Sequence, residues 1–243
     1  ANEKELQKSY KVFENILKVD GLNIVFDKRP KDLYFHFLEA LEGHRFDGIA
    51  GAVQRFLENI LCKWVKNCID ETKLKCVVFA GGVAQNIKAC KSITELSDIE
   101  DFFVCPAAGD TSLPIGACYF AMWEYLKKNN ISFDVIKPID NIYLGPEFSN
   151  EQILEAIRKE KTDSKYKMLT GIGPEEVARL LAEGNIIARC SGRMEFGLRA
   201  LGNRSILADP RRADTVRKIN QAIKFRDFWM PFTPTILAER QYD

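Results

Sequence analysis

Two short apolar segments that each lead into glycine constrain the fold of this 243-residue chain most strongly. The first runs from Cys76 to Ala80 and enters the paired glycines Gly81 and Gly82. The second, "DFFVCPAAGD", again places a turn after a short strand and ends at Asp110. A continuous apolar run of this length is typical of a strand buried in a parallel sheet. The two segments therefore predict an α/β fold in which two glycine-rich strand ends can converge on one cleft.

Helical periodicity surrounds these strands. In "RFDGIAGAVQRFLENILCKWVKNCID" the apolar residues recur every three or four positions, as on one buried helical face. We expect residues 1–70 to fold as helices. We expect Ser149 to cap its helix, Pro174 to occupy a first turn and Gly184 to end a helix. Further helices are predicted for 83–93, 115–130, 149–159, 173–184 and 209–223, and extended segments for 185–190 and 231–237.

The helical periodicity stops between residues 130 and 150, where prolines and a Gly-Pro pair interrupt it. We place a linker there, with one domain at residues 1–135 and a second at residues 136–243. The chain has no run of eighteen apolar residues and begins with the polar "ANEKELQKSY". We therefore expect neither a transmembrane span nor a signal peptide, and no membrane partner.

Cysteine and histidine are scattered along the chain. The seven cysteines form no CxxC pair, which suits reduced thiols in the cytosol and disfavours a zinc site or a disulfide framework. His36 and His44 are eight residues apart, unlike the spacing of four that is typical of helical metal-binding pairs. We expect a cytoplasmic protein in which the histidines alone form no metal site.

Positive charge is concentrated in residues 189–226. This segment contains eight arginines and two lysines against three acidic residues, although the whole chain has a net charge of +1. In its part "SGRMEFGLRALGNRS", glycines let the backbone bend between Arg193, Arg199 and Arg204, so that the three side chains can point into one pocket. Guanidinium groups bind phosphate or carboxylate oxygens through paired hydrogen bonds.

Lys224 and Arg226 lie just beyond this loop, and their spacing of two predicts that they share one side of an extended segment. With so few carboxylates in the segment, we expect an external anion as the partner of its cations. Nucleic acid is disfavoured, because the cations lie in a glycine-rich loop that lacks regularly placed aromatic residues for base stacking. A compact phosphate-bearing molecule fits better, and a basic RNA-binding or regulatory module without catalysis is the alternative.

The glycine-rich strand ends have a structural explanation beside the functional one. A Gly-Gly pair after a strand is often only a tight turn, and an aspartate such as Asp110 often only caps a helix. In the functional interpretation, backbone N–H groups at Gly81 and Gly82 approach a phosphate or a nucleotide, and the Asp110 carboxylate binds a divalent cation or a substrate hydroxyl.

Taken together, these motifs resemble the O-carbamoyltransferase family of the NodU/CmcH type. The resemblance runs from about residue 46 to the C-terminus and rests on the blocks "RFDGIAGAVQRFLE", "FAGGVAQN", "PAAGD", "YLGP", "GRMEFGLRALGNRSILADPR" and "INQAIKFRDFWMPFTPTIL". It implies that residues 1–135 are the C-terminal half of an actin-like, Kae-like ATPase-fold domain. Residues 136–243 would be the N-terminal part of a YrdC-like α/β domain. Leu198 departs from the family pattern, which has proline there.

The resemblance also implies an activity. Such enzymes use carbamoyl phosphate and ATP, through carbamoyl adenylate, to carbamoylate a hydroxyl group of a small-molecule acceptor. The chain would be an internal fragment that is inactive by itself. The sequence leaves open whether the protein forms a homodimer. An actin-like sugar kinase is a second alternative, which the ordered blocks after Tyr143 disfavour, because a kinase has no use for a second anion-binding domain. The sequence does not identify the acceptor.

Site residues are carried over by position. Arg193, Arg199 and Arg204 would be catalytic, binding carbamoyl phosphate and the ATP phosphates and offsetting the repulsion between two anionic reactants. Asp110 would be a ligand of the divalent metal of the actin-like site, expected to be iron, while Mg²⁺ accompanies ATP. The residues implied to bind the nucleotide and carbamoyl phosphate are Gly81, Gly82, Asn86, Lys224 and Arg226.

Overall fold

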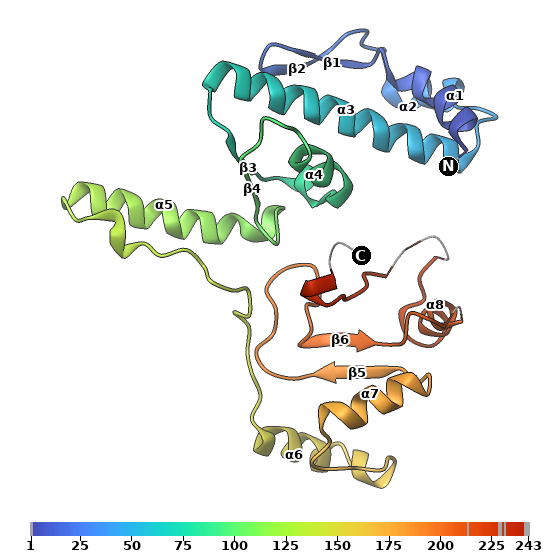
Figure 1. The fold of residues 1–243 in the computed structure, drawn as a ribbon, viewed down its shortest axis with the longest axis vertical. Coiled ribbons are helices and arrows are strands. Elements are labelled where there is room, and N and C mark those ends of the chain that lie inside the picture. The colour runs from blue at the N-terminus through green and yellow to red at the C-terminus, as the bar shows by residue number, and fades with distance from the viewer. Residues whose placement is uncertain (1, 213, 228–229, 231, 241–243) are drawn as a thin grey trace. The chain divides into compact units, whose positions relative to one another are not determined.

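The computed structural model describes residues 2–212, 214–227, 230 and 232–240 (Figure 1). It divides into two compact units, Ala1–Lys137 and Pro138–Asp243. The boundary falls inside the segment 130–150, where the helical periodicity of the sequence stops. Within the described ranges, no helix is both long enough and apolar enough to cross a membrane.

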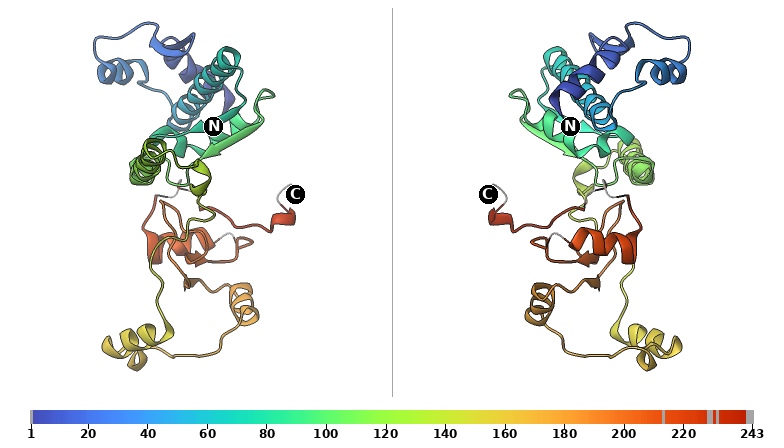
Figure 2. Two further views of the ribbon diagram at one scale, coloured as in Figure 1. Left: turned by 90° about the vertical axis from the view of Figure 1, so that its left-hand side faces the viewer. Right: turned by 90° about the vertical axis from the view of Figure 1, so that its right-hand side faces the viewer.

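The first unit is built on one long helix, α3 (Phe46–Thr72). Helix α1 (Glu3–Phe13) lies along it, as Figure 2 shows, and the buried Leu6, Phe13 and Ala52 form a small core between the two helices. The side chain of Phe37, from α2 (Leu33–Ala40), packs against this core. Asn2 and Asp32 cap α1 and α2 by accepting hydrogen bonds from backbone N–H groups of the first turn.

A β-hairpin interrupts the helical region that we expected over residues 1–70, so that prediction is wrong for residues 17–26. Strand β1 (Leu17–Asp20) pairs antiparallel with β2 (Asn23–Phe26), and Asp20 lies opposite Asn23. Gly21 in the two-residue turn has φ +57°, the left-handed conformation that favours glycine. Helix α3 contacts this turn through Trp64, whose Nε1 donates to the carbonyl oxygen of Leu22 at 2.8 Å.

The remainder of the first unit confirms the parallel α/β organisation. Strands β3 (Cys76–Phe79) and β4 (Asp101–Val104) are parallel, with a crossover through a short 3₁₀ helix and α4. Side chains on one face of this pair pack against α3 and α4, where Ile93 is fully buried. The other face is open, since Val78 is 75% exposed, so the expectation that β3 is a buried strand holds for one face only. The helical elements that complete the unit are Gly82–Gln85, α4 (Ile87–Thr94), Asp110–Ser112, α5 (Leu113–Lys128) and Phe133–Val135.

In the second unit an antiparallel strand pair, β5 (Ile187–Cys190) and β6 (Arg204–Leu207), is flanked by short helices. Ser149 caps the first of these helices in a reciprocal capping box with Gln152, and Gly184, at φ +91°, follows the second. Pro174 is the first residue of that second helix, as predicted. The helical elements of the unit are α6 (Asn150–Lys159), Thr162–Ser164, α7 (Pro174–Ala182), α8 (Thr215–Ile219), a π-helical turn Asn220–Lys224 and Ala238–Arg240.

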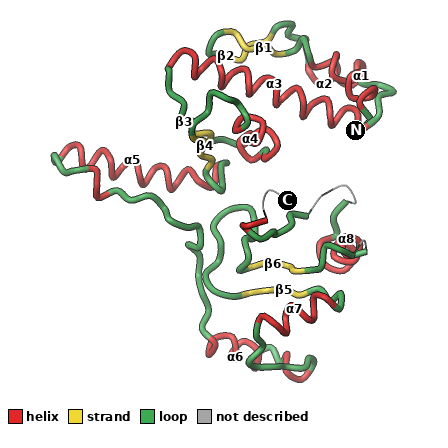
Figure 3. Tube along the Cα trace, viewed as in Figure 1, coloured by secondary structure: helices red, strands yellow, loops and turns green. Residues whose placement is uncertain are grey.

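One expectation for this unit is wrong, and a second remains a prediction. The helix predicted over 209–223 begins only at Thr215, because Asp209 instead accepts hydrogen bonds from Arg211 in a turn that precedes it. Of the extended segment predicted at 231–237, Pro231 lies outside the described residues, and 232–237 form neither helix nor strand. Figure 3 shows that residues 191–203, between the two strands, are a long loop.

The close packing of α1 on α3 depends on Gly48. A Cβ atom at this position would lie 2.8 Å from the carbonyl oxygen of Glu5, a backbone atom that cannot turn aside. We expect Gly48→Ala to lower the free energy of unfolding by about 1–3 kcal/mol, because α1 must move away from α3.

Gly116→Ala is the matched control, since Gly116 also lies in a helix but a Cβ there would meet no atom within 4 Å. Helix propensity predicts a gain of about 0.5–1 kcal/mol for this variant. Urea denaturation followed by circular dichroism measures both changes. A Gly48→Ala chain as stable as the Gly116→Ala chain would contradict the packing argument.

Candidate functional site

The two glycine-rich turns of the first unit meet at the carboxyl ends of β3 and β4. The backbone N–H of Gly81 donates to the carbonyl oxygen of Ala108 at 2.8 Å, which joins the turns directly. The side chain of Gln85 reaches the second turn, where its Nε2 would be 2.5 Å from a Cβ on Gly109. The predicted convergence of the two strand ends is therefore confirmed.

Gly81 and Gly82 line an open surface at this junction. Gly81 has φ +101°, so its own backbone conformation requires glycine. Gly82 has no positive φ, and a Cβ at either position would meet no atom within 4 Å. Nothing in the described structure explains why residue 82 lacks a side chain. A close approach of a ligand to the backbone would explain it.

Asn86 is held tightly at the start of α4. Its Oδ1 accepts from the backbone N–H of Ala89 at 3.0 Å, which caps the helix. Its side-chain amide also forms a reciprocal pair with Gln54 of α3, at 2.9 and 3.1 Å, and Gln54 Nε2 donates to Glu58 at 2.7 Å. These bonds give Asn86 a positioning role in the turn. Sequence reasoning missed Gln54, because a polar residue on a helix gives no signal of a distant partner.

Asp110 is exposed at the start of the short helical turn that leads into α5. Among the described residues, no group of three His, Cys, Asp or Glu side chains is placed to hold a metal ion. A single exposed carboxylate offers too few donors for iron or another divalent ion. The described residues by themselves therefore do not fit the iron site to which Asp110 was assigned.

In the second unit, the arginine-rich loop is docked on residues 142–146. Backbone hydrogen bonds join Gly145 N–H to the Met194 carbonyl (2.9 Å) and Met194 N–H to the Pro146 carbonyl (3.0 Å). The Arg193 guanidinium strengthens this contact by donating to the carbonyl oxygens of Gly145 (3.0 Å) and Leu144 (2.9 Å). Arg193, predicted as an anion ligand, thus spends two of its donors on the backbone.

The carboxylate of Glu195 organises the rest of this loop. Its Oε1 accepts from the backbone N–H groups of Leu201 (2.8 Å), Asn203 (2.7 Å) and Arg204 (3.2 Å). Partial burial of the carboxylate would raise its pKa, but the hydrogen bonds from backbone amides outweigh this effect and hold the pKa below its ordinary value of 4.5. Sequence reasoning did not assign Glu195 a role, since it looked like one more charge in a charged loop.

Arg204, the first residue of β6, has an incomplete set of partners. Its Nη1 donates to the carbonyl of Asn203 at 3.1 Å, while its Nη2 is shielded from water and has no hydrogen-bond partner in the described structure. The other cations predicted as ligands are more exposed: Arg199 and Lys224 lie at the surface and form no ion pair within the described ranges.

Lys224 and Arg226 do not share one side of an extended segment, so that prediction is wrong. Lys224 ends the π-helical turn, and Phe225, between the two cations, has φ +50°. This left-handed residue turns the chain, which removes the alternation of side chains on which the expectation relied. The Arg226 guanidinium carbon lies 5.2 Å from the centre of the Phe232 ring, in a cation–π contact.

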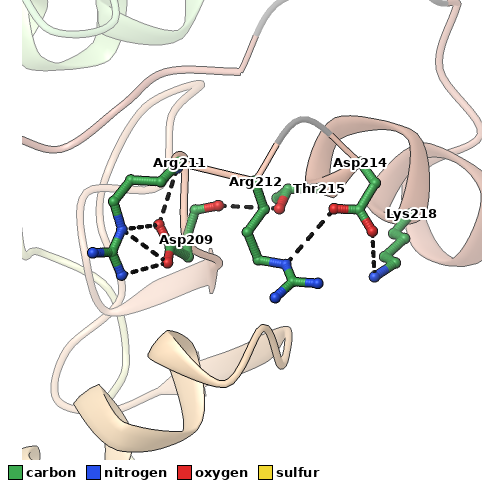
Figure 4. Close-up of polar contacts among 6 residues, drawn as sticks. All are labelled: Asp209, Arg211, Arg212, Asp214, Thr215 and Lys218. Atoms are coloured by element: carbon green, nitrogen blue, oxygen red, sulfur yellow. Dashed lines mark hydrogen bonds and ion pairs between the residues drawn. The ribbon is translucent and has the colours of Figure 1, made fainter.

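The remaining carboxylates of the segment 189–226 are occupied by other cations, as Figure 4 shows. Asp209 accepts from Arg211 (2.7 Å), and this hydrogen bond is the main cause that lowers the pKa of Asp209 to about 2. Asp214 pairs with Lys218 (2.5 Å) and, more distantly, with Arg212 (3.7 Å). With Glu195 bound to the backbone, all three carboxylates are engaged, and none of them neutralises Arg204.

Comparison with known proteins connects both of these regions to one family. Residues 3–119 match the family model described as Carbamoyltransferase N-terminus, and residues 178–243 match the model described as Carbamoyltransferase C-terminus. The first range contains the glycine-rich turns, and the second contains the arginine-rich loop.

Three relatives illustrate the range of the similarity. An uncharacterised protein of Methanocaldococcus jannaschii is 34% identical over 97% of this chain and 38% of its own length. The nodulation protein NolO of Bradyrhizobium diazoefficiens is 31% identical over 79% of this chain and 34% of its own length. The 3'-hydroxymethylcephem-O-carbamoyltransferase of Streptomyces clavuligerus is 26% identical over 66% of this chain and 28% of its own length.

The chain thus spans well under half the length of the relatives it matches. Similarity nevertheless extends over most of its own residues, and the two family models match it in the order N-terminus, then C-terminus. Proteins named nodulation protein U are also among its relatives. This chain belongs to the NodU/CmcH family of carbamoyltransferases.

Proposed function

We propose that this chain is part of an enzyme that transfers a carbamoyl group from carbamoyl phosphate to a hydroxyl group of a small molecule, with ATP as co-substrate. Membership of the carbamoyltransferase family supports the transfer itself. A relative whose name describes O-carbamoylation of a hydroxymethyl compound supports a hydroxyl acceptor.

The observation that carries the proposal is the unpaired Nη2 of Arg204. A guanidinium group is always charged, and a charged donor that is shielded from water without a partner is unfavourable. Every carboxylate of the surrounding segment is already engaged. An incoming phosphate oxygen would satisfy Arg204 with a charge-assisted hydrogen bond, and carbamoyl phosphate and ATP both supply such oxygens.

The proposed reaction proceeds through carbamoyl adenylate. Carbamoyl phosphate first loses its phosphate to water and leaves carbamate. A carbamate oxygen then attacks the α-phosphorus of ATP, and pyrophosphate departs with the electrons of the broken P–O bond. Finally the acceptor oxygen attacks the carbamoyl carbon, AMP leaves, and the hydroxyl proton passes to solvent. Two anionic reactants meet in the second step, so cations that offset their repulsion lower its barrier.

The roles of individual residues follow from their free donors. Arg204 binds a phosphate oxygen, Arg199 and Lys224 add exposed positive charge, and Arg193 fixes the loop to residues 142–146 while retaining Nη1 for a ligand. In the first unit, the open backbone at Gly82 is the proposed approach for the nucleotide phosphates. Mg²⁺ would accompany ATP as its counter-ion.

Arg204→Ala tests the anion site directly. Isothermal titration calorimetry of residues 1–243 with carbamoyl phosphate and with ATP is expected to show at least one ligand bound about tenfold or more weakly, because hydrogen bonds to charged groups contribute about 1.5–3 kcal/mol. Arg217→Ala, which removes an exposed arginine of α8, is the matched control and should change affinity less than about twofold.

Equal affinities of the native and Arg204→Ala chains would remove Arg204 from the site. The RNA-binding alternative predicts a different result. In that case single-stranded RNA binds with a steep salt dependence, and carbamoyl phosphate does not compete with it.

Glu195→Gln tests whether the loop is organised by a charged carboxylate. The pKa of Glu195 is lowered in the folded chain, so its stabilising contribution is complete above pH 4.5 and is lost as the pH falls through the folded-state pKa. In urea denaturation at a series of pH values, the native chain should be more stable than the variant at pH 7, and the difference should shrink below pH 4.5.

The matched control is Glu155→Gln, which removes an exposed glutamate of α6. Its stability curve should run parallel to that of the native chain over the same pH range. A constant difference between the native and Glu195→Gln chains from pH 7 to pH 3 would show that the charge of Glu195 does not order the loop.

The share of the relatives' length that this chain covers leads to a separate prediction about turnover. We expect residues 1–243 alone to give little or no carbamoyl-phosphate-dependent exchange of labelled pyrophosphate into ATP, whereas the product of the complete reading frame gives such exchange. This assay needs no acceptor. Robust exchange by residues 1–243 alone would overturn the expectation that the site is incomplete in this chain.

A further inference from the structure

A pocket of about 370 Å³ lies in the first unit, away from the glycine-rich turns. It is formed by the end of α1, the segment that follows β2 and the side of α2. Its volume is within the range of about 300–1,000 Å³ that is typical of small-molecule sites. None of the residues assigned to carbamoyl transfer lines it.

The rim of this pocket is cationic. Lys11, Lys28 and Arg29 line it, and no acidic residue does. None of the three cations forms an ion pair within the part of the chain that the structure describes. Arg29 has one aromatic contact, with its guanidinium carbon 5.2 Å from the centre of the Phe26 ring.

The neighbouring carboxylates are engaged elsewhere. Asp27, next to Lys28 in the chain, pairs with Lys18 at 2.7 Å, and the Lys18 hydrogen bond is the main cause that lowers the pKa of Asp27. Asp32 caps α2 by accepting from the backbone N–H groups of Tyr34 (2.8 Å) and Phe35 (3.1 Å). The Asp27 carboxylate interacts with the charge of Lys28 at longer range, but none of the three rim cations forms an ion pair with Asp27 or Asp32.

The backbone fixes the rim in place. The N–H of Lys28 donates to the carbonyl of Asn15 at 3.1 Å, and the N–H of Asp27 donates to the carbonyl of Ile16 at 3.0 Å. These bonds hold the segment after β2 against the end of α1, so Lys28 and Lys11 border the same space. These bonds place Lys28 beside the end of α1, at the start of the exposed loop that carries Arg29.

The apolar lining of the pocket, its floor, consists of Val12, Ile16, Pro30 and Ala40, and the polar residues Asn15 and His36 lie beside it. Ile16 is buried and Pro30 half-buried, while His36 presents its ring from α2. The Nε2 of His36 is shielded from water and has no hydrogen-bond partner in the described structure. The ring packs edge-on against Phe37, with 5.3 Å between the ring centres, so it has to turn before Nε2 can reach a ligand in the pocket.

We propose that this pocket binds a small organic phosphate, with the phosphate between Lys11, Lys28 and Arg29 and the apolar part of the molecule against Ile16 and Pro30. Three cations that form no ion pair favour a multiply charged anion, and an arginine beside lysines suits phosphate oxygens. An apolar floor with few polar groups favours an organic body over a free inorganic ion. His36 would complete the site as a hydrogen-bond partner.

Phenyl phosphate is the probe, with phenol and inorganic phosphate as comparisons. The chain has two histidines, and His44 is engaged with Ser9 Oγ through Nδ1 at 2.9 Å. In NMR spectra the imidazole signals of His36, identified with the His36→Gln variant, should shift on addition of phenyl phosphate, while those of His44 stay in place. Phenol should cause no shift. If inorganic phosphate shifts the His36 signals with the same affinity as phenyl phosphate, the proposed contact with an organic part of the ligand is wrong.

Charge variants test the rim. The double variant Lys28→Ala/Arg29→Ala should weaken phenyl phosphate binding about tenfold or more. Lys31→Ala is the matched control, because Lys31 carries the same charge two residues from Arg29 but does not line the pocket. It should change the affinity less than about twofold. Thermal unfolding of each variant shows whether it still folds.

The outcome can be separated from that of carbamoyl transfer. Arg204→Ala should leave the His36 shift unchanged, since Arg204 belongs to the other unit. A His36 shift that disappears in Arg204→Ala, or that persists undiminished in Lys28→Ala/Arg29→Ala, would overturn the proposal. The absence of any His36 shift with phenyl phosphate would do the same.

Discussion

Packing against α3 is the constraint on which most of the first unit depends. The same helix meets α1 at a glycine, binds the turn of the β-hairpin through Trp64, and holds the capping residue of α4 through Gln54. The last contact is the one that reaches the candidate nucleotide turn. An amide pair with 2.9 and 3.1 Å bonds fixes Asn86, and Asn86 in turn fixes the start of the helix after Gly82. A rigid support of this kind reduces the entropy lost when a ligand binds to the turn.

The second unit reaches order by different means. Few of its residues are buried. Among the described residues of this unit, Ile219 is the one apolar residue whose side chain is buried. Hydrogen bonds to charged groups also order this unit. Glu195 accepts from three backbone N–H groups, and Arg193 donates to two carbonyl oxygens. Such bonds are directional, so they fix a loop shape that apolar packing alone would leave open. The positive charge that remains, above all at Arg204, is then held in a defined place.

Sequence reasoning found the elements with strong local signals. The capping box at Ser149, the proline start of α7 and the parallel pairing of β3 with β4 follow from residue type and spacing. It overlooked the β-hairpin, although Asp20-Gly21 between apolar residues is a turn signal, because the helical pattern around it was longer. It placed Lys224 and Arg226 on one side of an extended segment, since nothing in the sequence indicates a left-handed Phe225.

Contacts between residues that are distant in the sequence could not be predicted from it, for a physical reason. Gln54 and Glu195 are polar residues whose importance comes from partners that only the folded chain brings near, whether 32 residues away or across a loop. The same holds for the pocket beside α2, where Lys11 and Lys28 come from separate elements. Composition counts charges, but it does not tell which of them are neutralised. In the segment 189–226 the carboxylates pair with Arg211 and Lys218, and this leaves Arg204 unpaired.

The two cationic regions differ in the kind of recognition that they support. Arg204 is partly shielded, and its neighbours are fixed by Glu195, so an anion there must match the direction of a planar guanidinium. The rim lysines of the pocket are exposed, and ammonium groups on flexible stems impose little geometry. Salt screens exposed charges much more than shielded ones. In the two proposed sites, selectivity at the pocket therefore depends more on the apolar floor, whereas selectivity at the arginine-rich loop depends more on the phosphate group.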